Sequence, residues 1–474
     1  MSLIIPANTL ASGGYAVDNS CRFDGSSSYM HKDIVTPTNQ KKYTISAWVK
    51  RSKLTSRQRV FTVIDVDSTA AYSYLEFQAD DKLNFDDFDG DSTRLTRTTN
   101  AQFRDPSAWM NIIIAVDTTI ADGSAVDRVK MYINGTQVSS FGTTTNASQN
   151  YDTTTLNSNK TFRIGEHGTA GFRLGGYICE FVLIDGLQLD ATSFGEFDED
   201  SGIWKPISVS GLTFGNNGFY LDYEDSANLG NDANGGTDLT EVNLAATDQS
   251  TDTCTNNFAT MNPLDNYLQA HAFSDGNLTV TTTNASQSYS TSSILLTSGK
   301  WYVECKPVSG GSEPEIGVAN KMVLLNAGNN AQLSYNANGY GYRASDPGTV
   351  WYNGEYVTNA LVAYANGDII GIALDLDNNK LYFSKNGTFA NSQDPTDGTN
   401  AVSIVDPAST EIGGYVFAMN ENFNDQNKVF SWNFGYPSYA ISSGNTDGNG
   451  YGNFEYAPPS GYFACCTKNL AENG

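Results

Sequence analysis

Stretches in which apolar and polar residues alternate recur along the whole chain, and a few stretches are apolar almost throughout. In YTISAWVK (43–50) every second residue from Tyr43 is apolar, and Trp48 adds a large ring on the opposite face, as in a strand packed on both sides. WMNIIIAVD (109–117) has the pattern of a fully buried strand, and GGYICEFVLID (175–185) has that of another central strand. These patterns predict β-strands rather than helices.

Asn-Gly pairs between alternating arms predict tight hairpins, one at Asn134-Gly135 in RVKMYINGTQV and another at Asn386-Gly387. In DIIGIALDLDNNKLYFSKNG (368–387), the carboxylates and amides of DLDNN are spaced as in a calcium loop. An EF-hand loop that began at Asp375 would need Gly at its sixth position and Glu at its twelfth, and neither is present. We therefore interpret residues 377–380 as a turn between two strands.

Several of these segments, taken in order, resemble known families. RFDG (22–25), YTISAWVK, W…NIIIAVD, KMYINGTQV and GGYICEFVLIDGLQL together resemble the LamG-like, concanavalin A-like jelly roll. KWYVECKPVSGGSEPEIGVAN, GDIIGIALDLDNNKLYFSKNG and VFSWNFGYP are similar, in that order, to a SPRY domain. The resemblance implies two concanavalin A-like β-sandwiches.

A chain of 474 residues is too long for one ordinary core, and two domains are expected. We predict an all-β protein with two jelly-roll domains. Its predicted parts are an N-terminal arm (1–14), a LamG-like sandwich (15–205), a loop-rich linker without periodicity (206–265), a SPRY-like sandwich (266–437) and an extended C-terminal arm (438–474). Aromatic residues in the last segment indicate that it docks on another surface.

Composition restricts the partners and the chemistry. With 27 basic and 52 acidic residues, the net charge of −25 repels phosphate backbones and anionic lipid, so neither nucleic acid nor membrane insertion is expected. The first residues have no basic region of a secretory signal, so we expect the chain to be made and folded in a cytoplasm. The six cysteines are scattered without metal-site spacing, and we predict buried free thiols.

Catalytic constellations are not evident, and no enzyme activity is expected. The three histidines lie outside any nucleophile motif. The nearest match to the Glu-x-Asp-x-x-Glu pattern of concanavalin A-like glycoside hydrolases is EFDED (196–200). Its Glu196 and Glu199 are three residues apart and would point to opposite faces of a strand.

A dense group of carboxylates in DDFDGD (86–91) is the candidate metal site. Hard oxygen ligands suit calcium, and LamG-like relatives can hold calcium at a sandwich rim. The alternative is a solvated acidic loop. The candidate calcium ligands are Asp86, Asp87, Asp89 and Asp91, and no other cofactor is expected.

Residues 41–59 contain seven basic residues and no acid. This asymmetry suits docking of an acidic neighbour, such as the Asp-rich face of another copy, or of an anionic sugar polymer. The alternative is a strand edge that its charges protect from pairing.

Aromatic residues are concentrated in YNANGYGYRASDPGTVWYNGEY (335–356), a segment rich in Gly and Asn. Such rings on loops suit stacking on sugars and protein interfaces, whereas core packing is the alternative. The candidate ligand-binding residues are Tyr340, Tyr342, Trp351 and Tyr352, and Tyr356 belongs to the same segment.

The order of modules resembles virion structural proteins of tailed phages, especially marine ones. The resemblance rests on the opening IIPANTLASGGYAVDNSCRFDG, the connector before the SPRY-like part and the ending PPSGYFACCTKNL. It implies a tail fibre, tail spike or capsid-attached fibre that binds host glycan or protein, located in the virion after assembly in the host cytoplasm. Its partners would be other virion proteins and sister subunits of a homotrimer. A purely architectural capsid or tail component and a polysaccharide-degrading enzyme are the alternatives.

Overall fold

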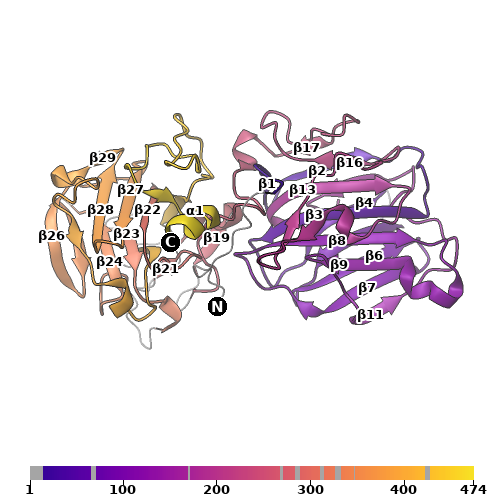
Figure 1. Ribbon diagram of the computed structural model, residues 1–474, viewed down its shortest axis with the longest axis horizontal. Coiled ribbons are helices and arrows are strands. Elements are labelled where there is room, and N and C mark those ends of the chain that lie inside the picture. The colour runs from indigo at the N-terminus through magenta and orange to yellow at the C-terminus, as the bar shows by residue number, and fades with distance from the viewer. Residues whose placement is uncertain are drawn as a thin grey trace. The chain divides into compact units, whose positions relative to one another are not determined.

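The computed structural model describes residues 14–65, 71–168, 171–266, 271–282, 289–309, 314–325, 332–345, 347–421 and 428–474. The chain divides into two compact units, and the boundary falls between Thr255 and Asn256 (Figure 1). Strands dominate both units, which confirms the all-β prediction. The described part contains one short α-helix, α1 (Thr467–Asn473), and none of its helices has the length and apolar character needed to cross a membrane.

Two eight-stranded sheets form the first sandwich, which corresponds to the LamG-like prediction. One sheet has the order β10-β9-β8-β3-β13-β1-β18, with β16 also paired to β13, and the other has the order β11-β7-β6-β5-β4-β12-β2-β17. The strands of the first sheet are β1 (Ser20–Asp24), β3 (Lys42–Arg51), β8 (Trp109–Asp117), β9 (Val129–Ile133), β10 (Thr136–Gln137), β13 (Gly175–Asp185), β16 (Phe219–Leu221) and β18 (Gln249–Ser250). Those of the second are β2 (Tyr29–Asp33), β4 (Gln58–Ile64), β5 (Tyr72–Phe77), β6 (Lys82–Phe88), β7 (Thr93–Gln102), β11 (Phe141–Thr145), β12 (Thr161–Ile164) and β17 (Thr240–Val242).

The sequence patterns of the long strands are confirmed. Ile45 and Val49 of β3 lie in the core between the sheets, and Trp48 on the opposite face is also buried. The hairpin at Asn134-Gly135 joins β9 and β10 with positive φ angles of 46° and 74° at the two turn residues. Both angles fit the turn that favours Asn-Gly.

The segment 206–265 differs from the predicted linker, because its residues up to Thr255 belong to the first sandwich. Here β16 pairs with β13, β17 with β2 and β18 with β1. The Lys50 ammonium and the Asp252 carboxylate form a buried ion pair at 2.6 Å, and the Trp109 indole N–H donates to the same carboxylate at 3.0 Å. Strands of two or three residues are too short to show periodicity, which is why the sequence pattern missed them.

The second sandwich pairs a nine-stranded with a six-stranded sheet. The first has the order β19-β20-β32-β22-β27-β28-β29, with β30 on β28 and β33 on β22, and the second has the order β21-β31-β23-β24-β25-β26. The larger sheet contains β19 (Ala272–Ser274), β20 (Thr279–Thr281), β22 (Lys300–Ser309), β27 (Ile370–Asp375), β28 (Lys380–Lys385), β29 (Thr388–Phe389), β30 (Val402–Ser403), β32 (Val429–Asn433) and β33 (Phe463–Ala464). The smaller contains β21 (Tyr289–Thr291), β23 (Pro314–Ala319), β24 (Gly339–Arg343), β25 (Gly348–Tyr352), β26 (Glu355–Leu361) and β31 (Val416–Glu421).

DLDNN forms the turn between β27 and β28, as predicted. Asn379 has a positive φ of 55°, and the Asp375 carboxylate accepts the Asn378 backbone N–H at 3.0 Å. The second predicted turn, at Asn386-Gly387, joins β28 to β29.

The segment 438–474 is not an arm that extends from the fold, because it packs on the second sandwich. β33 pairs with β22, and the Phe454 ring lies 5.3 Å from that of Tyr302. The buried Glu304 carboxylate accepts the backbone N–H groups of Glu455 at 3.0 Å and Tyr456 at 2.7 Å. The expected docking of its aromatic residues therefore occurs within the same domain. Of the predicted N-terminal arm, only residue 14 lies within the described part.

The six cysteines are free, and all except the partly buried Cys254 are buried. Burial raises the pKa of the Cys305 thiol well above its ordinary value. Reactive thiols need a lowered pKa and exposure, so this cysteine is inert.

Candidate functional site

The four aromatic residues predicted to bind a ligand lie on β24 and β25, and the structure separates them by sheet face. Tyr340 and Tyr342 point into the second sandwich, where the Tyr342 ring lies 5.1 Å from that of Phe383 on the facing sheet. Tyr352 is half-buried and stacks on Tyr340 at 4.3 Å. Tyr340 and Tyr342 are therefore core residues, out of reach of a ligand.

Trp351 points to the outer face of the six-stranded sheet together with Tyr356. The two residues are cross-strand partners on β25 and β26, and their ring centroids lie 4.0 Å apart. Tyr356 is 63% exposed, which is unusually high for a large aromatic side chain. The Arg343 guanidinium lies 4.0 Å from the centre of the Trp351 ring. We call these three residues, Arg343, Trp351 and Tyr356, the aromatic platform.

A buried polar network supports this platform. The Arg343 guanidinium pairs with the Glu315 carboxylate, which also accepts the Ser334 hydroxyl at 2.7 Å and the Asn420 amide at 3.2 Å. A Cβ on Gly341 would lie 3.0 Å from Glu315 Oε2, so the absence of a side chain at Gly341 makes room for the carboxylate. The platform is thus a cluster of side chains, supported from below, that presents one exposed ring suited to stacking on a sugar ring or an apolar side chain.

The sequence patterns did not single out Arg343, and Tyr356 was named only as a member of the aromatic segment. The register of the hairpin carried the missing signal, because the two-residue turn Asn353-Gly354 places Trp351 opposite Tyr356. Strand alternation then separates Trp351 from Tyr352.

The structure does not bring the four candidate calcium ligands together. Asp86 and Asp87 are adjacent on β6 and point to opposite faces. Asp87 is fully buried and accepts the Tyr151 hydroxyl at 2.7 Å and the Thr154 backbone N–H at 3.0 Å. Burial raises its pKa.

Asp89 and Asp91 lie in the turn after β6. Asp89 accepts the Ser92 backbone N–H at 3.0 Å, and Arg94 pairs with both carboxylates. Within the described ranges, no group of three or more His, Cys, Asp or Glu side chains is arranged to hold a metal ion. The carboxylates of DDFDGD are therefore used in hydrogen bonds and ion pairs of the sandwich.

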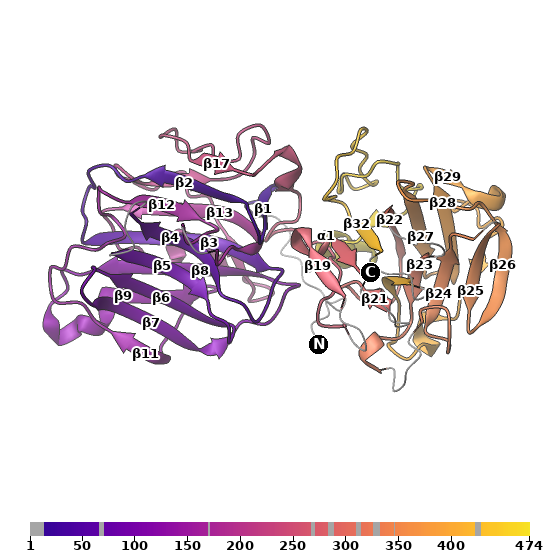
Figure 2. The same ribbon diagram turned by 180° about the vertical axis from the view of Figure 1, so that it is seen from behind.

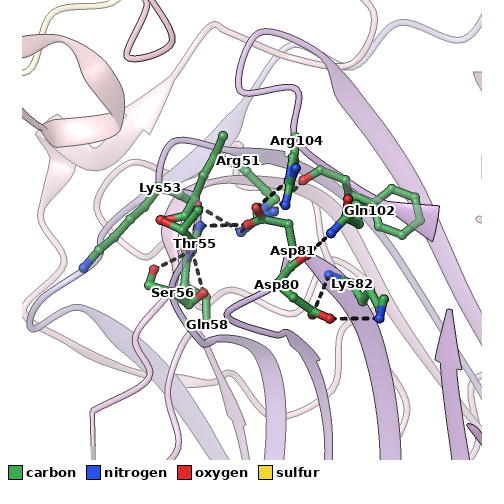
Figure 3. A network of polar contacts seen from close by, with 12 residues as sticks. Arg51, Lys53, Thr55, Ser56, Gln58, Asp80, Asp81, Lys82, Gln102 and Arg104 are labelled. Carbon is green, nitrogen blue, oxygen red and sulfur yellow. Dashed lines mark hydrogen bonds and ion pairs between the residues drawn. The ribbon is translucent and has the colours of Figure 1, made fainter. Parts of the chain in front are cut away.

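Several basic side chains of residues 41–59 are also buried in the first sandwich, where they pair with acidic residues. Figure 3 shows Arg51 and Arg104 on either side of the buried Asp81 carboxylate, at 3.1 Å and 3.0 Å, with the Thr55 backbone N–H donating at 2.8 Å. The Lys50 ammonium forms a buried ion pair with the Asp252 carboxylate. The acidic partners come from other parts of the chain, so the charge asymmetry along the sequence is largely cancelled in space.

EFDED lies on a separate two-stranded hairpin of β14 (Gly195–Phe197) and β15 (Trp204–Pro206). Glu196 pairs with Lys205 at 3.3 Å, whereas Glu199 lies in the loop that joins the two strands. The two glutamates do not share a strand face.

Family comparisons match a part of each sandwich. Residues 23–187 match Laminin_G_3, described as the concanavalin A-like lectin/glucanases superfamily, and residues 299–393 match the SPRY domain. The chain therefore contains a LamG-like concanavalin A-like domain and a SPRY domain, as the resemblance of the ordered segments implied. No curated protein matches the chain.

The solved structures found by comparison share little sequence with the chain. Domains LG4-5 of the mouse laminin alpha1 chain are 11% identical, with 97% of this chain and 90% of that chain covered and a TM-score of 0.31. The SPRY domain of human HERC1 is 17% identical, with 36% of this chain and 96% of that chain covered and a TM-score of 0.28. A SAP-like pentraxin from Limulus polyphemus is 14% identical, with 36% of this chain and 78% of that chain covered and a TM-score of 0.28.

Proposed function

We propose that the chain is a non-catalytic binding protein that attaches to glycan or protein on a cell surface through the aromatic platform. The observation that carries this proposal is the exposed Tyr356 ring, which packs against Trp351 at an interplanar angle of 39°, while Trp351 in turn lies on the Arg343 guanidinium. A large ring held rigidly in place loses little conformational entropy on binding, so it contributes affinity at a small cost.

At the level of the particle, we propose an appendage of a tailed phage: a tail fibre, a tail spike or a capsid-attached fibre. The resemblance of the opening, connector and ending segments to such virion proteins supports this proposal. Weak contacts at one platform gain avidity when a homotrimer, and many trimers on one virion, engage the host together. The segment 438–474 packs on its own domain, so we assign attachment to other virion proteins to other surfaces.

A glycan array probed with the full chain tests the binding proposal. We expect binding to a subset of glycans from host envelopes, and loss of that binding in Tyr356→Ala. Val362→Ala is the matched control, because Val362 is similarly exposed at 53% but lies outside the platform. Product release from a bound polysaccharide would contradict the non-catalytic proposal.

Electron cryomicroscopy of the virion tests the particle-level proposal. Sandwiches that project from the particle would support an adhesive appendage. Burial of the aromatic platform by neighbouring subunits would favour the architectural alternative instead.

A further inference from the structure

The buried ion pair between Lys50 and Asp252 lies beside two aromatic rings of the first sandwich. Lys50 is on β3, and cross-strand pairing places it opposite Trp109 on β8 and opposite Tyr177 on β13. Figure 2 shows β8, β3 and β13 side by side. The Lys50 Nζ atom lies 5.7 Å from the centre of the Tyr177 ring, and the ring centroids of Tyr177 and Trp109 are 6.3 Å apart. The rings on both neighbouring strands therefore shield the ion pair.

Both side chains of this pair are almost completely removed from solvent, with 1% of Lys50 and 0% of Asp252 exposed. In the pair of Lys300 with Asp375, by comparison, the lysine side chain is 30% exposed. Burial lowers the pKa of the Lys50 ammonium, and the negative charge of Asp252 opposes this shift. A buried ion pair has lost the hydration of both charges, so it gains little over uncharged groups. Transfer of one proton from Lys50 Nζ to Asp252 Oδ2 turns the pair into a neutral amine beside a carboxylic acid.

Hydrogen bonds hold the Asp252 carboxylate and backbone in place. Oδ2 accepts from Lys50 Nζ at 2.6 Å, and Oδ1 accepts the Trp109 indole N–H at 3.0 Å. The Ser20 hydroxyl donates to the Asp252 backbone carbonyl at 2.7 Å, and the Asp252 backbone N–H donates to the Ser250 hydroxyl at 3.1 Å. These contacts keep Nζ next to the carboxyl carbon Cγ. Groups held together in this way react far faster than the same groups free in solution.

We propose that Lys50 and Asp252 condense to an isopeptide bond, so that their ion pair is the precursor of a covalent cross-link between β3 and the segment after β18. The neutral Nζ attacks Cγ of the protonated carboxyl group, and the Trp109 indole N–H stabilises the negative charge that develops on Oδ1. The Cγ–Oδ2 bond then breaks. Oδ2 leaves as one water molecule with its own proton and one proton from Nζ, and the amide keeps the last N–H. The step needs no oxidant, reductant or cofactor.

The cross-link would fasten the last part of the first sandwich to its centre. β18 has two residues, and Asp252 follows it shortly before the boundary between the two units at Thr255. β3 is a central strand, paired on both sides with β8 and β13. Tension along the chain at this boundary would therefore reach β3 through a covalent bond instead of being held by a two-residue strand. The bond also joins residues 202 positions apart and so restricts the unfolded state.

Intact-mass spectrometry of the denatured full chain tests the proposal, which is independent of the proposed binding function. We expect a mass lower than that of the sequence by one water molecule, and a tryptic digest with a branched peptide that joins residues 50 and 252. Lys50→Arg keeps the positive charge, but its guanidinium stays protonated and cannot attack, so this variant should have the full sequence mass. Lys300→Arg is the matched control and should keep the loss of water, because Lys300 lies in a solvent-exposed pair.

Asp252→Asn tests the chemistry at Cγ, because attack on a carboxamide releases ammonia instead of water. Loss of ammonia with the same branched peptide would support the proposal. Three results would overturn it: the full sequence mass in an unmodified chain whose circular dichroism shows folded β-structure, loss of water that persists in Lys50→Arg or Asp252→Asn, and loss of water without the branched peptide. The last result would indicate a reaction elsewhere, such as formation of an aspartyl succinimide.

Discussion

The Glu315 carboxylate and the Arg343 guanidinium form an ion pair between β23 and β24 in which both side chains are almost completely buried. This pair lies under the Trp351 ring and fixes the position of the aromatic platform. A buried pair is costly to break, because the remaining charge is left without its partner.

Arg343→Met should therefore destabilise the second sandwich by about 3–5 kcal/mol, because it leaves the Glu315 charge buried. The double variant Glu315→Gln/Arg343→Met should recover part of this loss. Urea unfolding followed by tryptophan fluorescence measures both. A single variant as stable as the unmodified chain would contradict the buried pair.

Buried glutamates should make stability depend on pH. Burial raises the pKa of Glu180 in the first sandwich and of Glu304 in the second to about 7, from an ordinary value of 4.5. Between these values the native state binds more protons than the unfolded state, so stability falls as the pH rises through this window. Each group lowers the free energy of unfolding by about 3 kcal/mol above pH 7 relative to pH 4.

Glu180→Gln should flatten this dependence in the first sandwich alone, because a glutamine does not titrate. Thermal unfolding between pH 4 and 8 measures the slope for each domain. An identical slope in the variant and the unmodified chain would show that Glu180 ionises normally.

The turn at Gly135 should not accept a side chain. Gly135 has a φ of +74°, and a Cβ would lie 2.2 Å from the Trp204 ring, so Gly135→Ala combines backbone strain with a clash. Gly171→Ala is the matched control, because Gly171 has a φ of +78° and a Cβ there would meet no atom of the described residues within 4 Å. We expect the control to lower the free energy of unfolding by about 1 kcal/mol and Gly135→Ala to lower it clearly more. Thermal unfolding measures both. Equal effects would mean that Trp204 moves aside without cost.

The docked C-terminal segment should contribute to the stability of the second sandwich. Phe454 is fully buried, so Phe454→Ala should lower the free energy of unfolding by about 3–5 kcal/mol. Val308→Ala, at a side chain that is 46% exposed, should change it little. Urea midpoints compare the two, and equal effects would contradict a docked segment.

Long strands could be predicted from the sequence because five or more residues reveal a period, as in β3, β8 and β27. The strands β16, β17 and β18 could not, since they have two or three residues each. The partner of Lys50 is Asp252, 202 residues away, so nothing local showed that the basic stretch would be neutralised. Within the aromatic segment, the concentration of aromatic residues indicated Trp351 as a candidate. Only the hairpin register shows that Trp351 lies on the outer face of the sheet, whereas Tyr342 is buried.

We expect the exposed Tyr356 ring of the aromatic platform to bind a surface ligand. Calorimetric titration of the strongest glycan from the array into the unmodified chain, Tyr356→Ala and Val362→Ala tests it most directly. We predict about tenfold or greater weakening in Tyr356→Ala, in line with the loss of an aromatic contact at a binding surface, and no change in Val362→Ala. Equal affinities for all three proteins would contradict the account.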